Sequence, residues 1–405
     1  MIQLNEALTR LLAAVEPVAD TEIVLTAHAR GRVLAGAQAA SISVPSADNS
    51  AMDGYAVRLT DAGCERPVLQ RVPAGRWPEA LPADGVARIF TGASVPAGTQ
   101  AVVMQEHCAT RTDESGQVWV HLPAEIQPQQ NIRRAGEDIR LGAEILSAGQ
   151  RLSAAHLGLA ASVGLAHLPV RRPVRVALFS TGDELVMPGD PLPPGAIYNS
   201  NRFTLRALLE GLGCEVHDLG IVPDQLQATR DALAHAAQSA DLVLTSGGVS
   251  VGEEDHLKPA LESQGQLDLW QIAIKPGKPF AYGRIHRAGG GHAHFVGLPG
   301  NPVSSFVTFL LLARPLLRRL AGEAEVAEPT LTLPAAFAWS RPDPKRSEFL
   351  RARLNEQGQV ERYGHQGSGV LSSLAWAQGL VCLAPGQAVQ PGDAVRFIPL
   401  MLNAV

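Results

Sequence analysis

Cysteine is scarce in this 405-residue sequence, and its four residues lie far apart. None belongs to a CxxC pair or has a histidine partner at zinc-finger spacing, which argues against a disulfide framework and a zinc finger. We therefore expect buried thiols in a reducing compartment at the four positions Cys64, Cys108, Cys214 and Cys382.

Long apolar runs are also missing. The most apolar stretch, residues 303–320, is interrupted by Arg314 and Pro315, so it predicts a core helix rather than a membrane span. The N-terminal stretch MIQLNEALTRLLAAV predicts an amphipathic helix and lacks the features of a signal peptide. We expect a cytoplasmic protein with no membrane span.

An excess of positive charge is absent, because the net charge is −5 and the pI is near 6.2. This balance argues against a nucleic-acid-binding surface. The Walker A, GxSxG and HExxH motifs are missing too, which argues against the enzyme classes that use them. With 46% apolar and 18% charged residues, a chain of this length predicts a globular protein of two to four domains.

Changes in the sequence pattern predict a multidomain α/β plus β fold. A central βαβ parallel-sheet domain is flanked by an N-terminal mixed region, which contains a small β domain, and by a C-terminal β-barrel-like domain. The predicted domains are 1–42 with 135–170 (helical and extended), 43–134 (inserted β domain), 171–323 (α/β) and 324–405 (C-terminal β). The predicted C-terminal strands are 330–333, 348–354, 359–363, 380–383 and 394–398.

Residues 174–320 alternate between strand and helix patterns, and repeated βαβ units imply a parallel sheet. The predicted strands are 174–179, 214–219, 241–246, 269–274, 280–283 and 294–296, and the predicted helices are 199–212, 225–238 and 303–320. The loops after the strands carry carboxylates, hydroxyls, lysines and glycines. Because ligands of such sheets bind beyond the carboxyl ends of the strands, we expect these loops to form one site.

The stretch 241–256, DLVLTSGGVSVGEEDH, carries most of this prediction. Gly247 and Gly248 allow a tight turn whose amide groups can face an anion. Glu253, Glu254 and Asp255 can hold a divalent cation against that anion. The alternative is a glycine turn followed by a solvated acidic helix start.

Two further loops favour the same chemistry. Asp183 and Glu184 suit Mg²⁺ together with phosphate oxygens, and Lys275 and Lys278 suit neutralisation of phosphate or an oxyanion. The residues therefore predict metal-assisted chemistry on a phosphoanhydride, and they do not name the substrate.

Other polar clusters have two interpretations each. Asp53 precedes a glycine and can belong to a plain turn or to a functional site. The run 131–139, NIRRAGEDI, is typical of surface salt bridges. The basic cluster has two interpretations: it can keep an edge strand from pairing with another chain, or it can reach an anionic ligand on another domain. Its members are Lys345, Arg346, Arg351 and Arg353.

Nine motifs occur in order across residues 48–373: DNSAMDGYAVR, RIFTGASVPAG, NIRRAGEDI, FSTGDEL, YNSN, VLTSGGVSVGEEDH, IKPGKPFAYG, GLPGNPVS and GHQGSGVLSS. By these motifs the chain closely resembles the molybdopterin molybdenumtransferases, the family that includes the C-terminal domain of gephyrin. Competence-damage-type proteins share the smaller molybdenum-cofactor-binding fold but would not carry the flanking regions present in this chain.

The resemblance implies an elongated, four-part subunit that forms a homodimer with a composite active site. It implies insertion of molybdate into the dithiolene of adenylylated molybdopterin, with Mg²⁺-dependent release of AMP. It also implies partners, namely the molybdopterin adenylyltransferase and molybdoenzymes.

The resemblance transfers site roles to individual positions of this sequence. The implied catalytic residues are Asp53, Thr91, Glu184, Asp224 and Asp255. The implied metal ligands are Glu184, Asp224 and Asp255. The implied substrate-binding residues are Ser180, Thr181, Gly182, Ser246, Gly247, Gly248, Ser250, Lys275, Lys278, Pro299, Pro302, Arg351, Ser368 and Ser372, of which Arg351 and the last two serines are expected to contact pterin or molybdate.

Two other functions stay open. One is a binding or scaffolding protein of the same fold in which catalysis is lost or secondary, although the acidic and lysine loops are intact. A nucleotide pyrophosphatase that acts on another dinucleotide would differ in that molybdate does not stimulate hydrolysis.

Overall fold

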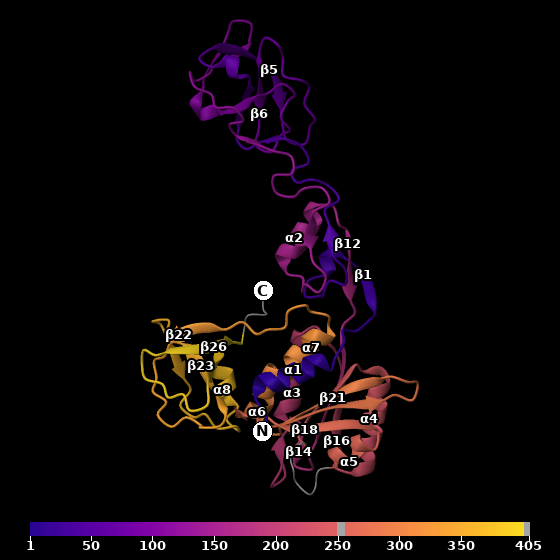
Figure 1. Cartoon of the computed structure of the whole chain (residues 1–405). Helices are drawn as coiled ribbons and strands as arrows, with labels where there is room; N and C mark the ends of the chain where they lie inside the picture. The colour runs from indigo at the N-terminus through magenta and orange to yellow at the C-terminus, as the bar shows by residue number, and fades with distance from the viewer. Residues whose placement is uncertain (249–255, 401–405) are drawn as a thin grey trace. The chain divides into compact units, whose positions relative to one another are not determined.

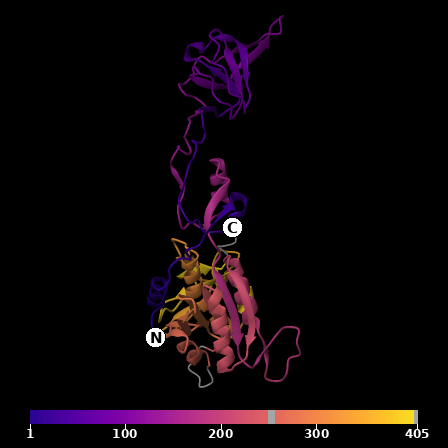
Figure 2. The same cartoon turned by 90° about the vertical axis from the view of Figure 1, so that its right-hand side faces the viewer.

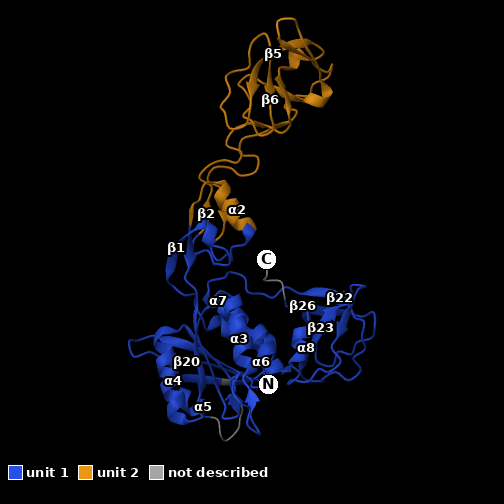
Figure 3. Cartoon of the chain, turned by 180° about the vertical axis from the view of Figure 1, so that it is seen from behind, with its two compact units in different colours: residues 1–36, 148–154, 168–405 blue, residues 37–147, 155–167 orange. Residues whose placement is uncertain are grey.

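The structure is a computed structural model that describes residues 1–248 and 256–400. Its contacts divide the chain into two compact units (Figure 3), and each is described by itself. Unit 1 comprises residues 1–36, 148–154 and 168–405, and unit 2 comprises residues 37–147 and 155–167. The division into four domains remains a prediction.

A six-stranded sheet forms the centre of unit 1 (Figure 1). Its strands lie in the order β16 (Glu215–Val222), β13 (Arg175–Thr181), β17 (Leu242–Ser246), β21 (His292–Leu298), β20 (Pro279–His286) and β18 (Gly265–Gln271). The first four are parallel, as predicted, whereas β20 is antiparallel to both of its neighbours. The prediction of a wholly parallel sheet is therefore wrong. Residues 287–291 join β20 to β21 and are too short for a crossover, so they form a hairpin with two glycines at positive φ.

Helices cover both faces of this sheet (Figures 1 and 2). One face packs against α1 (Leu4–Ala13), α3 (Ser200–Gly211), α6 (Pro302–Thr308) and α7 (Arg314–Leu320). The other face packs against α4 (Leu226–Ser239) and α5 (Leu257–Glu262). Successive side chains of a strand point to opposite faces of the sheet. In β13, Val176 and Leu178 therefore belong to the first core, and Ala177 and Phe179 belong to the second. This burial on both faces explains the unbroken apolar run of the strand.

Two predicted elements differ in the structure. The predicted strand 269–274 is confirmed only for residues 269–271, because β18 ends at Gln271 and Ile274–Lys275 forms a separate strand, β19. The predicted helix 303–320 contains a π-helical turn, Phe309–Ala313, between α6 and α7. Pro315 has no backbone N–H and its ring crowds the preceding turn, which favours a locally wider helix.

The C-terminal part of unit 1 is a second six-stranded sheet. Its path is β19, β23 (Ser347–Leu354), β25 (Gly379–Leu383), β26 (Ala394–Pro399) and β22 (Leu331–Pro334), with β24 (Val360–Arg362) paired to β23. β19 and β23 are parallel, and the other neighbours are antiparallel. Ala335 follows β22 and forms a bridge to Val360 of β24, which curls the sheet around its own core. The five predicted strands here are present, with no end shifted by more than one residue.

Unit 2 is built around a sheet in the order β7 (Ala101–Met104), β4 (Gly54–Val57), β6 (Val86–Ile89), β5 (Glu65–Val72), β9 (Val118–His121) and β8 (Ala109–Thr112). Separate apolar clusters cover its two faces. Two short ribbons and α2 (Ala154–Ser162) complete the unit, where Ser41 donates a hydrogen bond to the carbonyl of Val163.

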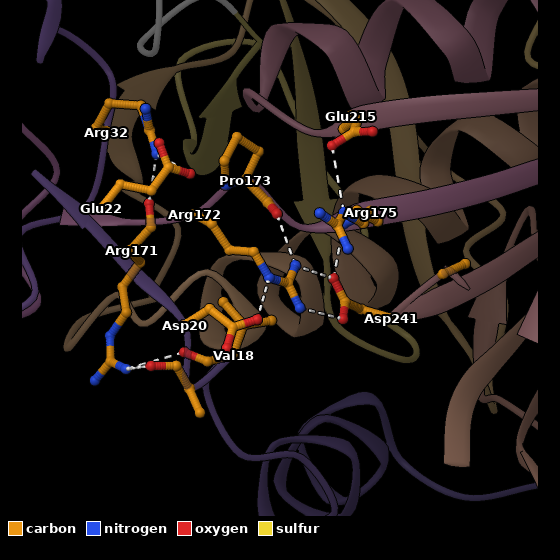
Figure 4. A network of polar contacts seen from close by, with 12 residues as sticks. Val18, Asp20, Glu22, Arg32, Arg171, Arg172, Pro173, Arg175, Glu215 and Asp241 are labelled. Atoms are coloured by element: carbon orange, nitrogen blue, oxygen red, sulfur yellow. Dashed lines mark hydrogen bonds and ion pairs between the residues drawn. The ribbon is translucent and has the colours of Figure 1, made fainter. Parts of the chain in front are cut away.

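The start of β13 is held by a network of polar contacts (Figure 4). Arg172 donates two hydrogen bonds to the carboxylate of Asp241, at 2.7 and 2.8 Å, and one to Asp20 at 2.7 Å. The same carboxylate of Asp241 accepts the backbone N–H of Arg175 at 2.8 Å. The bonds to Asp241, and next those to Asp20, raise the pKa of Arg172 above its ordinary value.

The described part of the chain contains no helix that is long and apolar enough to cross a membrane. All four cysteines are free, but they are half-buried, so the expectation of buried thiols holds only in part. Burial raises the pKa of Cys108 to about 11 and that of Cys214 to about 12, which keeps both thiols protonated near neutral pH.

Candidate active site

A cavity of about 570 Å³ lies at the carboxyl ends of the parallel strands of unit 1. This volume suits a ligand of nucleotide size. The strands converge there because β13, β17 and β21 are in parallel register, with Ser246 opposite both Ser180 and Leu298. The walls come from four strand-end or helix-start loops and one C-terminal loop: Thr181, Glu184, Leu185, Ile197, Tyr198, Asn199, Ser200, Asn201, Ser246, Gly247, Gly300, Asn301, Pro302, Gly369 and Leu371.

The structure brings several predicted site residues to this cavity. Thr181, Glu184, Ser246, Gly247 and Pro302 line it directly. Their chain neighbours Ser180, Gly182, Gly248 and Pro299 occupy the same loops, and the hydroxyl of Ser180 is buried without a hydrogen-bond partner in the described part of the chain. Ser250 and Asp255, like Glu253 and Glu254, lie outside the described residues.

The glycine turn after β17 has a geometry that only glycine accommodates well. Gly247 has φ +94°, and a Cβ atom at this position would lie 3.0 Å from the carbonyl oxygen of Thr181. Its amide donates to the carbonyl of Leu298 at 3.0 Å, so this N–H is already used and does not face an anion as expected. The turn therefore shapes the cavity mainly through close backbone approach.

Of the predicted metal ligands, Glu184 lines the cavity, and Asp224 contacts Thr181 of the cavity wall. Glu184 is exposed, and its carboxylate folds against Gly182, where an added Cβ would lie 2.6 Å from Oε2. Asp224 follows β16 and accepts a long hydrogen bond of 3.4 Å from the hydroxyl of Thr181. Residues 1–248 and 256–400 contain no group of three His, Cys, Asp or Glu side chains arranged to hold a metal. Two carboxylates and a hydroxyl nevertheless fit Mg²⁺, which keeps several waters and takes other oxygens from a phosphorylated substrate.

The two predicted lysines occupy the loop between β18 and β20, at the same edge of the sheet. Lys275 belongs to β19, and its Nζ donates to Glu348 Oε1 at 2.9 Å while 46% of its side chain stays exposed. Glu348 is 1% exposed, and its other oxygen accepts the indole N–H of Trp339 and the amide of Asp343, at 2.8 and 2.9 Å. The ammonium group of Lys275 is thus held in place with N–H groups to spare. Lys278 is exposed.

The C-terminal loop 363–373 supplies the remaining wall. The carbonyl of Ser368 accepts the N–H of Val303 at the start of α6, at 3.0 Å, which ties the loop to the α/β part. Ser372 is exposed, and its hydroxyl lies 3.3 Å from that of Tyr363. The loop therefore places Gly369 and Leu371 against the cavity.

Arg351 lies beneath this loop and is wholly buried. Its guanidinium donates to Ser373 Oγ at 3.0 Å and to the carbonyls of Phe349 and Gly367 at 3.2 and 3.1 Å. Burial lowers the pKa of Arg351 to about 10. A direct contact of this side chain with pterin or molybdate was predicted, but in this conformation it can act only by positioning the loop. The other members of the predicted basic cluster also separate, since Arg346 pairs with Asp343 and Arg353 with Glu361.

Asp53 and Thr91 meet in unit 2. Asp53 Oδ1 accepts the hydroxyl of Thr91 at 2.6 Å and its backbone N–H at 2.8 Å. The hydroxyl, and then the amide, lower the pKa of Asp53 below its ordinary value. The sequence interpretation of 131–139 as a salt-bridging run also fits, because Arg134 pairs with Asp48 at 2.6 Å.

Sequence reasoning missed several residues of this region. Asn199 and Tyr198 lie in the YNSN motif, which carried the resemblance but received no role, and both line the cavity. Glu348 was predicted only as part of a strand. Its place directly before the apolar pair Phe349–Leu350 in a predicted strand was the available signal of a buried ionic partner.

Comparison with known proteins covers almost the whole chain. Three family models match in succession: the MoeA N-terminal region (domain I and II) at residues 2–164, a probable molybdopterin binding domain at 177–319, and the MoeA C-terminal region (domain IV) at 332–400. A molybdopterin molybdenumtransferase of Haemophilus influenzae is 42% identical over 407 residues, which cover 98% of each chain. The chain belongs to the molybdopterin molybdenumtransferase family of enzymes.

Other relatives agree with this family assignment. Molybdopterin molybdenumtransferase 2 of Mycobacterium tuberculosis is 39% identical over 87% of this chain and 88% of its own. Gephyrin of Dictyostelium discoideum is 31% identical over 80% of this chain and 50% of its own. The crystal structure of a molybdopterin biosynthesis MoeA protein from Pyrococcus horikoshii matches with a TM-score of 0.83 and 27% identity, over 98% of this chain and 100% of that one.

Proposed function

We propose that this enzyme inserts molybdate into the dithiolene of adenylylated molybdopterin and releases AMP in a Mg²⁺-dependent step. The observation that carries the proposal is the cavity at the carboxyl edge of the sheet, where the carboxylate of Glu184, several hydroxyls and glycine turns meet. Membership of the molybdopterin molybdenumtransferase family supports it. The three matched family regions, which flank and include a probable molybdopterin binding domain, support the substrate class.

In this proposal the carboxylates bind the metal ion and the lysines bind the anionic substrates. Glu184 and Asp224 would hold Mg²⁺, with Asp255 as the further predicted ligand, and the bound ion would neutralise charge on the phosphoanhydride. Lys275, held by Glu348, would attract molybdate or phosphate oxygens, and exposed Lys278 would add to the positive field. Thr181 and Ser246 would orient the substrate from neighbouring strand ends.

We further propose a homodimer whose composite active site adds Asp53 and Thr91 of one subunit to the cavity of the other. The firm contact between Asp53 and Thr91 gives that pair a defined geometry to offer. The predicted partners are the molybdopterin adenylyltransferase, as the source of substrate, and molybdoenzymes, as acceptors of the product. The cytoplasm is the predicted site of action.

The reaction is tested with purified protein, adenylylated molybdopterin, molybdate and Mg²⁺. AMP release is followed by chromatography, and cofactor formation by activation of an apo-molybdoenzyme. Glu184→Gln should lower molybdate-dependent AMP release on the order of a hundredfold, since a metal contributes several kcal/mol of charge stabilisation. The control Glu356→Gln, an exposed residue of the β23–β24 turn, should leave the rate unchanged. AMP release that molybdate does not stimulate would instead favour a pyrophosphatase, and no turnover of a folded protein would favour a scaffold.

Co-expression tests the composite site. The Asp53→Asn and Glu184→Gln variants should each be inactive alone. When the two are co-expressed, about half of the dimers are mixed, and each mixed dimer holds one intact site out of two. The whole population should therefore regain about a quarter of the wild-type activity. No recovery in mixed dimers would show that each site is built within one chain.

A further inference from the structure

The cavity wall contains a buried amide whose donor is unused. Asn199 directly precedes α3, lines the cavity and is 2% exposed. Its Oδ1 accepts the N–H of Arg202 at 3.2 Å, which is the N-cap arrangement and defines the other terminal atom as the nitrogen. That nitrogen, Nδ2, has no hydrogen-bond partner among residues 1–248 and 256–400. Native proteins rarely keep such a donor buried unless a ligand or a water supplies the acceptor.

The first turn of α3 points to the same kind of ligand. α3 is 12 residues long, and the backbone N–H groups of a first helical turn have no acceptor within the helix. Ser200 and Asn201 of this turn line the cavity beside Asn199. The Nδ2 of Asn201 donates to the carbonyl of Gly300 at 2.7 Å, which fixes the helix start against the loop after β21. A helix start of this kind favours oxygen acceptors that carry negative charge.

The neighbouring wall is apolar and exposed. Ile197 and Tyr198 form β15, are 55% and 43% exposed, and line the cavity together with Leu185 of β14 (Leu185–Val186). The hydroxyl of Tyr198 is directed to the carbonyl of Asp190 at 3.2 Å, which leaves the ring as the contact surface. A flat heterocycle suits such a surface, while its phosphate suits the helix start.

We propose that Asn199 and the first turn of α3 form the subsite for the phosphate of a phosphorylated aromatic heterocycle. Asn199 has two functions in this subsite, because Oδ1 caps the helix and Nδ2 donates to a phosphate oxygen. The ring of the same ligand lies against Ile197 and Tyr198. This inference rests on the proposed function, within which it assigns the nucleotide phosphate of the adenylylated substrate to α3.

The test uses the full chain, the substitution Asn199→Asp, and AMP and adenosine as probes in isothermal titration calorimetry. Aspartate keeps the shape and the capping oxygen but replaces the donor with a negative charge. The affinity for AMP should fall about tenfold or more, the loss of one hydrogen bond to a charged group, while the affinity for adenosine stays the same. Asn355→Asp is the matched control, because Asn355 also accepts backbone N–H groups, those of Gln357 and Gln359, but lies in the β23–β24 turn.

Three results would overturn the subsite: equal affinity of wild type and Asn199→Asp for AMP, an equal loss for AMP and adenosine, or a wild type that binds AMP no more tightly than adenosine. If Asn199→Asp does not fold, Asn199→Ser, which keeps a shorter capping hydroxyl, replaces it with the same expected outcome. A protein that shows the expected pattern but releases no AMP in the presence of molybdate and Mg²⁺ would refute the proposed function and leave the subsite in place. Molybdate-dependent release of AMP by a protein that lacks this binding pattern would refute the subsite and leave the proposed function in place.

Discussion

Arg172 offers a direct comparison of two carboxylates that bind one guanidinium. Its side chain is 15% exposed, that of Asp241 is 13% exposed and that of Asp20 is 71% exposed. Asp241 accepts three N–H groups, two from Arg172 and one from the backbone of Arg175. In Asp241→Asn one of the two oxygens becomes an N–H₂ group, so at least one of these donors loses its acceptor and Arg172 loses its buried counter-charge.

We expect Asp241→Asn to cost about 3 kcal/mol, the lower end for breaking a buried ion pair, because some solvent reaches both side chains. Scanning calorimetry of the full chain should then show a transition lowered by about 6 °C. Asp20→Asn removes an ion pair of similar length from the same arginine, but its solvent-exposed carboxylate should shift the transition by no more than about 2 °C. Equal shifts for the two variants would refute the reasoning from burial. In an Arg172→Met background both asparagine substitutions should lose most of their effect.

Three further predictions concern the proposed site. Glu348→Gln should raise the KM for molybdate about tenfold, because Lys275 loses its charged partner, and steady-state assays of AMP release would measure this. Gly247→Ala should lower the free energy of unfolding by about 1–3 kcal/mol, because alanine is strained at φ +94° and its Cβ would crowd a carbonyl oxygen; urea denaturation would measure this. Thr91→Val should raise the pKa of Asp53 toward its ordinary value, since the hydroxyl that stabilises the carboxylate is lost while the amide remains, as a carboxyl ¹³C NMR titration would show.

Each of the three has a control. Lys275→Met should raise the KM for molybdate as Glu348→Gln does, and the double variant should add little; additive effects would mean that Glu348 does not act through Lys275. Gly189 also has a positive φ but open space around it, so Gly189→Ala should cost less than Gly247→Ala. Thr91→Ser keeps the hydroxyl and should leave the pKa of Asp53 depressed. An unchanged pKa of Asp53 in Thr91→Val would show that the Thr91 hydroxyl does not cause the lowered pKa.

The elements that the sequence predicted well are those whose signals are local. The helix predicted at 199–212 is present as α3, because an asparagine cap precedes it and Gly213 follows it at φ +78°. The strands at 174–179 and 241–246 are present because burial on both faces makes their centres, residues 176–179 and 242–244, apolar without interruption. The convergence of Thr181, Glu184 and Ser246 at one edge followed from parallel strand direction alone.

The sequence could not predict features that depend on distant partners. The direction of β20 depends on its hairpin, and the placement of Ile274–Lys275 depends on a strand more than 70 residues away. The burial of Arg351 was hidden because its neutral partners, a hydroxyl and two carbonyls, leave no charge pattern in the sequence. The assignments of Mg²⁺, of Asp255 and of the dimer remain predictions.

The pairing of β19 with β23 has a consequence for dividing this protein into fragments. Ile274–Lys275 belongs by sequence to the α/β region but by hydrogen bonding to the C-terminal sheet. A C-terminal fragment that begins near residue 324 would uncover this edge of β23 and deprive the buried carboxylate of Glu348 of its lysine, and uncovered edges invite aggregation. An α/β fragment that ends near residue 323 would leave a two-residue strand without a partner. The boundary visible in the sequence is thus a poor place to cut, and the two regions behave as one unit for truncation, domain exchange and recombination.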